Sequence, residues 1–115
     1  MLGTLPIEVV YDEIDTNLYC PGPGNGPWID ELAGFEPSSG EVLRVGLIAT
    51  YARWKGQDVF IDAAAQVPET AGPASIRFYV IGGPIYETRG SQFSLHELRE
   101  HAKQRGVEDR IGFVP

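Results

Sequence analysis

The sequence predicts a small α/β protein with a partial Rossmann-like fold. This would be half of a doubly wound, three-layer αβα domain, with a parallel sheet of three core strands and a possible edge strand. Strand-like and helix-like segments alternate along residues 42–114, as is typical of parallel sheets with crossover helices. The run 42–50 is almost continuously apolar, which favours a strand covered on both faces. Because three parallel strands make only half of a doubly wound sheet, a strand meant to be central would be left at an edge.

Residues 1–40 have the composition of an inter-domain linker that contains one short strand and one short helix. The strand is predicted at Ile7–Tyr11, where β-branched and aromatic residues precede an acidic turn. The proline- and glycine-rich run 21–27 cannot form a regular ladder and predicts a loop. A short helix is predicted between Pro27 and Gly34, with apolar positions at Trp28, Ile29, Leu32 and Phe35.

Residues 41–115 carry the alternating elements of the predicted half-domain. Pro68 would end the first of its helices, and Gly106 the second. Ser94 and Glu97 form a capping box, in which each side chain satisfies a backbone amide at the start of a helix. The predicted elements are a strand at 42–50, a helix over Val59–Val67, a strand at Ser75–Ile81, a helix from Ser94 to Gly106 and a strand at 110–114.

Composition and charge narrow the class of protein. A chain of 115 residues with 43% hydrophobic and 22% charged residues is typical of one ordinary globular domain. Its net charge of −7 argues against nucleic acid or an anionic membrane as the main partner, because both require a basic face. The single cysteine, Cys20, cannot form an internal disulfide, and no secretory or membrane-spanning run is present in the sequence. We therefore expect a cytoplasmic protein without a membrane span.

The turn 50–58 is the candidate ligand-binding segment. It connects the carboxyl end of a strand to the start of a helix, where free amides and a partial positive charge attract anions. Arg53 and Lys55 add full charges, and this combination in the turn from Thr50 through Gly56 suits a diphosphate. A solvated basic turn that only begins a helix is the alternative. The sequence contains neither a P-loop nor a dinucleotide-binding glycine fingerprint.

A second candidate loop follows the strand at Ser75–Ile81. In Gly82-Gly83-Pro84 the two glycines lack a Cβ, so a ligand or a neighbouring loop can approach the backbone closely. A plain tight turn is the alternative. The loop continues as a long polar stretch, which favours a functional surface: Tyr86, Glu87, Thr88, Arg89, Ser91 and Gln92.

Other chemically capable residues do not form a recognisable site. His96 and His101 are five residues apart, which places them on different faces of the predicted helix as surface residues. Asp12, Glu13 and Asp15 are adjacent acids in a turn, and such groups are commonly only solvated. No nucleophile has a recognisable partner, so we expect no catalytic residue and no metal or other cofactor.

Taken together, four segments resemble the opening of the donor domain in retaining glycosyltransferases of the GT-B architecture, in the large family usually numbered four (group 1). The segments are 9–15, 45–58, 78–84, and 97–98 through 110–114. The resemblance implies that the basic turn binds the diphosphate of a nucleotide sugar. Lys55 matches the lysine of the family's Lys-Gly pair, while Thr50 stands where the family usually has an arginine, with Arg53 as its substitute. Gly82-Gly83 matches a loop beside the donor.

The resemblance also implies that much of such an enzyme lies outside this sequence. The acceptor-binding domain has no counterpart, nor does the part of the donor domain with the family's Glu-x7-Glu acidic motif. The segment 12–15 resembles the inter-domain hinge. We therefore expect an excised or truncated half-domain, inactive alone, from an enzyme that transfers a sugar from a nucleotide-diphosphate sugar to an acceptor. The alternative is a non-catalytic nucleotide-binding or self-associating fragment, which could form a homo-oligomer through its exposed sheet edge.

Overall fold

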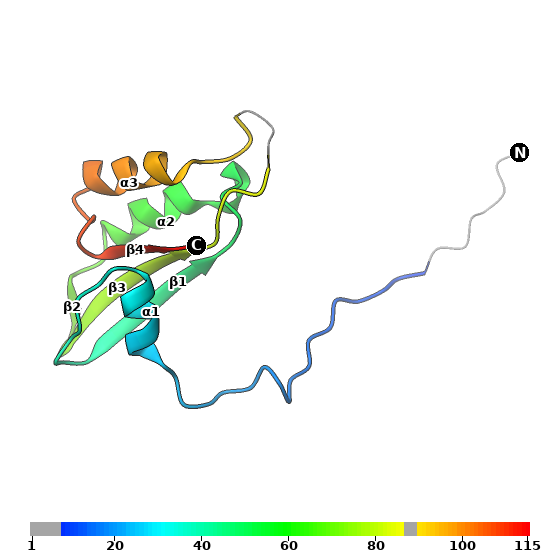
Figure 1. Ribbon diagram of the computed structural model, residues 1–115, viewed down its shortest axis with the longest axis horizontal. Coiled ribbons are helices and arrows are strands. Elements are labelled where there is room, and N and C mark those ends of the chain that lie inside the picture. Colours follow the sequence, from blue (N-terminus) through cyan, green and yellow to red (C-terminus); the bar gives the residue numbers. More distant parts are fainter. Residues whose placement is uncertain (1–7, 87–89) are drawn as a thin grey trace, which may run out of the picture.

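The computed structural model describes residues 8–86 and 90–115 as three α-helices, one 3-10 helix and a four-stranded sheet. Figure 1 shows their arrangement. The elements in chain order are α1 (Gly26–Leu32), β1 (Val42–Ile48), η1 (Arg53–Lys55), α2 (Gln57–Ala64), β2 (Thr70–Ala71), β3 (Ala74–Ile81), α3 (Leu95–Gln104) and β4 (Ile111–Val114). The predicted α/β class is confirmed.

The sheet is built around β3, which pairs with every other strand. It runs parallel to β1, with Val45 opposite Phe78, and parallel to β4, with Phe78 opposite Ile111. The two-residue strand β2, which the sequence pattern did not predict, pairs antiparallel with the start of β3. The three longer strands are therefore parallel and lie in the order β1-β3-β4.

The main hydrophobic core lies between one face of this sheet and the helices α2 and α3 (Figure 1). Alternate residues of β3 point into it, because successive side chains of a strand face opposite sides. The core is formed by Tyr51, Ile61, Ala64, Ile76, Phe78, Val80, Leu98, Ala102, Val107 and Ile111. The predicted capping box is confirmed at the start of α3, since the Ser94 side chain accepts from the Glu97 amide and the Glu97 carboxylate accepts from the Ser94 amide.

Helix α1 covers part of the opposite face of the sheet (Figure 1). The Asn25 side chain accepts a hydrogen bond from the Trp28 amide and caps its start, and Gly34 follows its end with φ of +78°, as the sequence predicted. Its last turn packs directly on β4. A Cβ at Gly112 would lie 2.4 Å from the Cβ of Ala33, so only glycine permits this close approach.

Two sequence predictions about strands are wrong. Residues 8–11 form no strand and are exposed, whereas Ile7 lies outside the described residues. Strand β1 is not covered on both faces either. It lies at an edge of the sheet, where Leu43 is 49% and Ile48 is 79% exposed. The apolar run 42–50 predicted the strand itself. In the part of the chain described, however, no second strand pairs with the outer edge of β1, and several of its apolar side chains stay exposed.

No helix within residues 8–86 and 90–115 has the length and apolar character needed to cross a bilayer.

Candidate functional site

The two candidate loops meet at the carboxyl end of the sheet. The amide of Tyr51, after β1, donates to the carbonyl of Gly83, after β3, at 3.1 Å. Ala52 forms an isolated antiparallel bridge with Gln92, and the Arg53 amide donates to the carbonyl of Ser91 at 3.1 Å. The two segments that the sequence singled out are thus joined by backbone hydrogen bonds into one surface.

Lys55 occupies the exposed end of the first loop. It is the last residue of η1, and Gly56 follows with φ of +78° and serves as the N-cap of α2. Glycine adopts this left-handed conformation readily because it has no Cβ. Gly56 has no side chain to cap the amides of the first turn. The exposed residue Lys55 therefore directly precedes the N-cap of α2, whose positive end favours binding of an anion.

Arg53 is held within the structure by three contacts. Its Nε donates to the Gly90 carbonyl at 3.1 Å, one terminal nitrogen pairs with Glu97 at 2.8 Å, and the guanidinium lies 4.4 Å from the centre of the Phe93 ring. The Ser94 amide and the Arg53 guanidinium lower the pKa of Glu97 to about 2. Arg53 therefore fastens the first loop to the start of α3, and its charge is already neutralised by Glu97.

Thr50 lies at the base of the turn. The Thr50 carbonyl accepts a 2.6 Å hydrogen bond from the side-chain Nε2 of Gln57. The Gln57 side chain is fully buried. The Thr50 hydroxyl is shielded from solvent and lacks a hydrogen-bond partner among the described residues, as does the Gln57 side-chain oxygen. Thr50 and Gln57 thus shape the turn from below, while Lys55 and Gly56 form its outer part.

The Gly82-Gly83-Pro84 loop holds the ends of three strands together. A Cβ at Gly82 would lie 2.2 Å from the Ala49 carbonyl oxygen, and its φ is +128°. Its amide donates to the carbonyl of Val114 at 2.8 Å. A Cβ at Gly83 would meet nothing within 4 Å, and Pro84 is exposed. The group that closely approaches Gly82 is the carbonyl of Ala49, directly after β1.

The sequence reasoning did not single out Trp54 as a site residue. The ring centres of Trp54 and Tyr86 are 5.8 Å apart. Trp54 is 67% exposed and Tyr86 is 41% exposed. Gln92 orders the second loop beside them, because its side-chain oxygen accepts from the amides of Ile85 and Tyr86 at 3.1 and 3.0 Å. The isolated aromatic residue between Arg53 and Lys55 was the available signal for this exposed pair.

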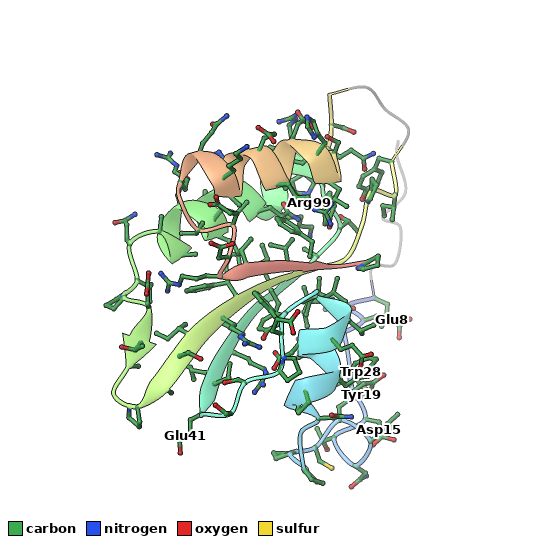
Figure 2. All side chains as sticks on the ribbon, turned by 60° about the vertical axis from the view of Figure 1, so that its left-hand side comes forward. Glu8, Asp15, Tyr19, Trp28, Glu41 and Arg99 are labelled. Carbon is green, nitrogen blue, oxygen red and sulfur yellow. The ribbon has the colours of Figure 1, made fainter. Side chains whose placement is uncertain are left out.

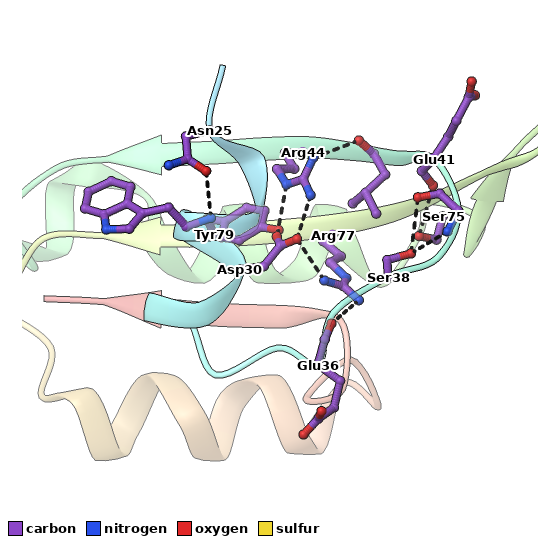
Figure 3. Close-up of polar contacts among 12 residues, drawn as sticks. Asn25, Asp30, Glu36, Ser38, Glu41, Arg44, Ser75, Arg77 and Tyr79 are labelled. Carbon is purple, nitrogen blue, oxygen red and sulfur yellow. Dashed lines mark hydrogen bonds and ion pairs between the residues drawn. The ribbon is translucent and has the colours of Figure 1, made fainter. Parts of the chain in front are cut away.

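A second feature missed from the sequence is a buried charge cluster under α1 (Figure 3). Asp30, 3% exposed, accepts from Arg44 at 2.9 and 2.5 Å and pairs with Arg77 at 3.1 Å. The hydroxyl of Tyr79 also donates to Asp30. Asp30, Arg44 and Phe35 line a cavity of about 460 Å³ between α1 and the sheet. The charged members of the cluster, Asp30, Arg44 and Arg77, are far apart in sequence and give no local motif.

His96 is exposed, as predicted, but His101 is not a free surface residue. Its Nε2 lies 2.7 Å from Asp62, which also accepts from Arg105 at 2.8 Å. These contacts join α2 to α3 and lower the pKa of Asp62, the His101 hydrogen bond being the main cause. Asp12, Glu13 and Asp15 lie in the exposed segment before α1. In the residues described, no group of three or more His, Cys, Asp or Glu side chains could hold a metal ion.

Comparisons of the chain with protein-family models, with curated proteins and with solved structures find no match.

Proposed function

We propose that the turn after β1 binds the diphosphate of a nucleotide sugar, as part of an enzyme that transfers the sugar to an acceptor. The observation that carries the proposal is the position of Lys55, an exposed residue that directly precedes the N-cap of α2, where no side chain caps the helix. In residues 8–86 and 90–115 its side chain has no ion-pair partner. In sugar transfer, such a group would neutralise the charge that develops on the departing diphosphate.

The strand order supports the same proposal. In an open α/β sheet, ligands bind beyond the carboxyl ends of the strands, and the reversal of strand order marks the place. Here the order β1-β3-β4 leaves the far edge of β1 open. We interpret this sheet as half of a doubly wound, Rossmann-like sheet, in which β1 would be central. The turn after β1 would then lie at the reversal of strand order.

The structure modifies the roles that the resemblance implied. Arg53 pairs with Glu97, so we assign it to positioning the turn, and we assign the charge on the diphosphate side to Lys55. Gly56 and the first amides of α2 would supply backbone donors. Gly83 and Pro84 would border the site from the second loop. On this proposal the chain supplies only diphosphate contacts, and we expect no sugar transfer from it alone.

The test is a titration of the isotope-labelled chain with uridine, adenosine and guanosine diphosphates, followed through backbone amide shifts. We expect shifts in residues 53–59 and at Gly82 and Gly83. Replacing Lys55 removes a charge-assisted hydrogen bond, typically about 1.5–3 kcal/mol, so Lys55→Met should weaken binding about tenfold or more. Lys103→Met is the matched control, because Lys103 is the chain's other lysine and lies in the last turn of α3. Absence of shifts up to millimolar nucleotide, or equal effects of both variants, would refute the proposal.

A further inference from the structure

Asn25 and Gly26 are adjacent at the start of α1 (Figure 3). Asn25 is exposed, and its backbone, with φ of −108° and ψ of 68°, is not helical. The backbone nitrogen that follows an asparagine can attack the side-chain amide, and glycine obstructs this approach least because it has no side chain. The chain's other asparagine, Asn17, is followed by Leu18.

The surroundings of Asn25 favour this attack. Its side-chain oxygen accepts a hydrogen bond from the Trp28 amide at 3.3 Å, which stabilises the negative charge that forms on that oxygen when a nucleophile adds to Cγ. The Arg44 guanidinium lies so close to Gly26 that a Cβ there would overlap Nη1. A positive charge at this position favours loss of the proton from the Gly26 amide. As the first residue of α1, Gly26 has no carbonyl within the helix to occupy its N–H.

We propose that Asn25 is a modification site, at which the side-chain amide is converted to isoaspartate and aspartate without an enzyme. The Gly26 nitrogen loses its proton and bonds to Cγ of Asn25. The bond between Cγ and the side-chain nitrogen then breaks, and ammonia leaves with that proton. Water opens the resulting cyclic imide. Breaking the bond from the Gly26 nitrogen to Cγ gives aspartate, whereas breaking the bond to the main-chain carbonyl carbon gives isoaspartate.

The two products differ in their effect on α1. Both add a negative charge next to Gly26, against which the Arg44 guanidinium packs. Aspartate keeps the length of the main chain, and its carboxylate can still accept from the Trp28 amide. Isoaspartate inserts a methylene group into the main chain and moves the carboxylate away from the cap position. Because Asp30 of α1 is bonded to Arg44 of the sheet, we expect isoaspartate to loosen α1 from the sheet.

The test is incubation of the full chain at mildly alkaline pH, followed by peptide mapping with mass spectrometry. Asn17 is the internal control, because it is also exposed and lies between Asp15 and Tyr19, which Figure 2 labels in the segment before α1. We expect isoaspartate and aspartate at position 25, formed about tenfold faster than at position 17 or more. An Asn25 that stays intact, or that is modified no faster than Asn17, overturns the proposal.

Two variants separate the modification from its consequence. Asn25→Ser keeps a capping side chain but has no amide to lose, so no modification should appear at position 25. Asn25→Asp supplies the new charge without the inserted methylene. The purified isoaspartate form should unfold at a lower urea concentration than Asn25→Asp and than the unmodified chain. Equal midpoints of the isoaspartate form and Asn25→Asp would contradict the loosening of α1. None of these measurements involves a nucleotide, so their outcome is independent of the proposed diphosphate site.

Discussion

At the scale of single residues, Asp30 joins α1 to the sheet through Arg44, Arg77 and Tyr79. Hydrogen bonds from Arg44 hold the pKa of Asp30 below its ordinary value, although burial acts in the opposite direction. Burial and the hydrogen bond to Asp30 raise the pKa of Tyr79 to about 12. Asp30 is thus ionised and Tyr79 neutral at ordinary pH. One carboxylate of a helix of only seven residues thereby pairs with two arginines of the sheet.

Asp30→Ala should lower the free energy of unfolding by about 3 kcal/mol or more, because it leaves Arg44 and Arg77 without their common partner. Urea denaturation at neutral pH measures the change, and Glu31→Ala, at an exposed site on the same helix, is the control. The pKa of Asp30 is lower in the folded chain than its ordinary value of 3.8. Its contribution to the free energy of unfolding is therefore complete above pH 3.8, and it is lost as the pH falls through the pKa of the folded state. Equal stability of the two variants would contradict this role.

Glu97 offers a direct test of the contact that anchors the first loop. Its pKa of about 2 arises from the Ser94 amide first and from Arg53 second. Arg53→Met should therefore raise the pKa of Glu97 only part of the way toward 4.5, because the Ser94 hydrogen bonds remain. Carboxyl carbon shifts followed by NMR between pH 2 and 5 would measure it. Arg105→Met, which removes a contact to Asp62, should leave the Glu97 value unchanged. An unaltered pKa in the Arg53 variant would exclude the ion pair.

The sequence could predict the positions of those candidate residues that depend on local chain geometry. Lys55 and Gly56 are placed by the helix start that follows them, so their position was predictable. The pairing of Arg53 with Glu97 spans 44 residues and follows from how the loop and α3 pack together. The Asp30 cluster likewise joins residues on α1, β1 and β3. No local spacing encodes such contacts, and the sequence reasoning missed them.

At the scale of elements, the sequence predicted the helices and turns that depend on neighbouring residues. It did not predict whether a strand would find another strand to pair with. The capping box of Ser94 and Glu97 forms within one helical turn, so the start of α3 was predictable. The strand expected at Ile7–Tyr11 was wrong over residues 8–11, because strand-forming side chains need a neighbouring strand and none is present there. β2 is only two residues long and exists through its pairing with Ala74 and Ser75.

Gly82 shows how an element boundary depends on a single missing Cβ. Gly82→Ala would place a methyl group 2.2 Å from the Ala49 carbonyl oxygen, at a φ of +128° that other residues rarely adopt. We expect a loss of about 2 kcal/mol or more in unfolding free energy, through backbone strain and separation of the ends of β1 and β3. Gly83→Ala meets open space and should be nearly neutral. Thermal unfolding of both variants provides the measurement, and a tolerated Gly82→Ala would show that the strand ends separate without cost.

At the scale of the whole molecule, the chain consists of a layered body and an extended segment that does not support it. Residues 8–25 are exposed throughout, whereas the body has a core on one face of the sheet and α1 on the other. The body's stability should therefore depend on α1 and on the residues after it.

Two shortened chains test this division. A chain that begins at Asn25 keeps the cap of α1 and should unfold with a free energy within about 0.5 kcal/mol of the full chain, because only exposed residues of the described segment are lost. A chain that begins at Glu41 also loses α1 and Asp30. It exposes Tyr79, which is 1% accessible in the full chain, and leaves Arg44 and Arg77 unpaired. We expect the second chain to be several kcal/mol less stable, or unfolded, by urea denaturation and circular dichroism. If both shortened chains were equally stable, α1 would be an attachment rather than a layer of the fold. If the first were already unfolded, the segment before α1 would belong to the body.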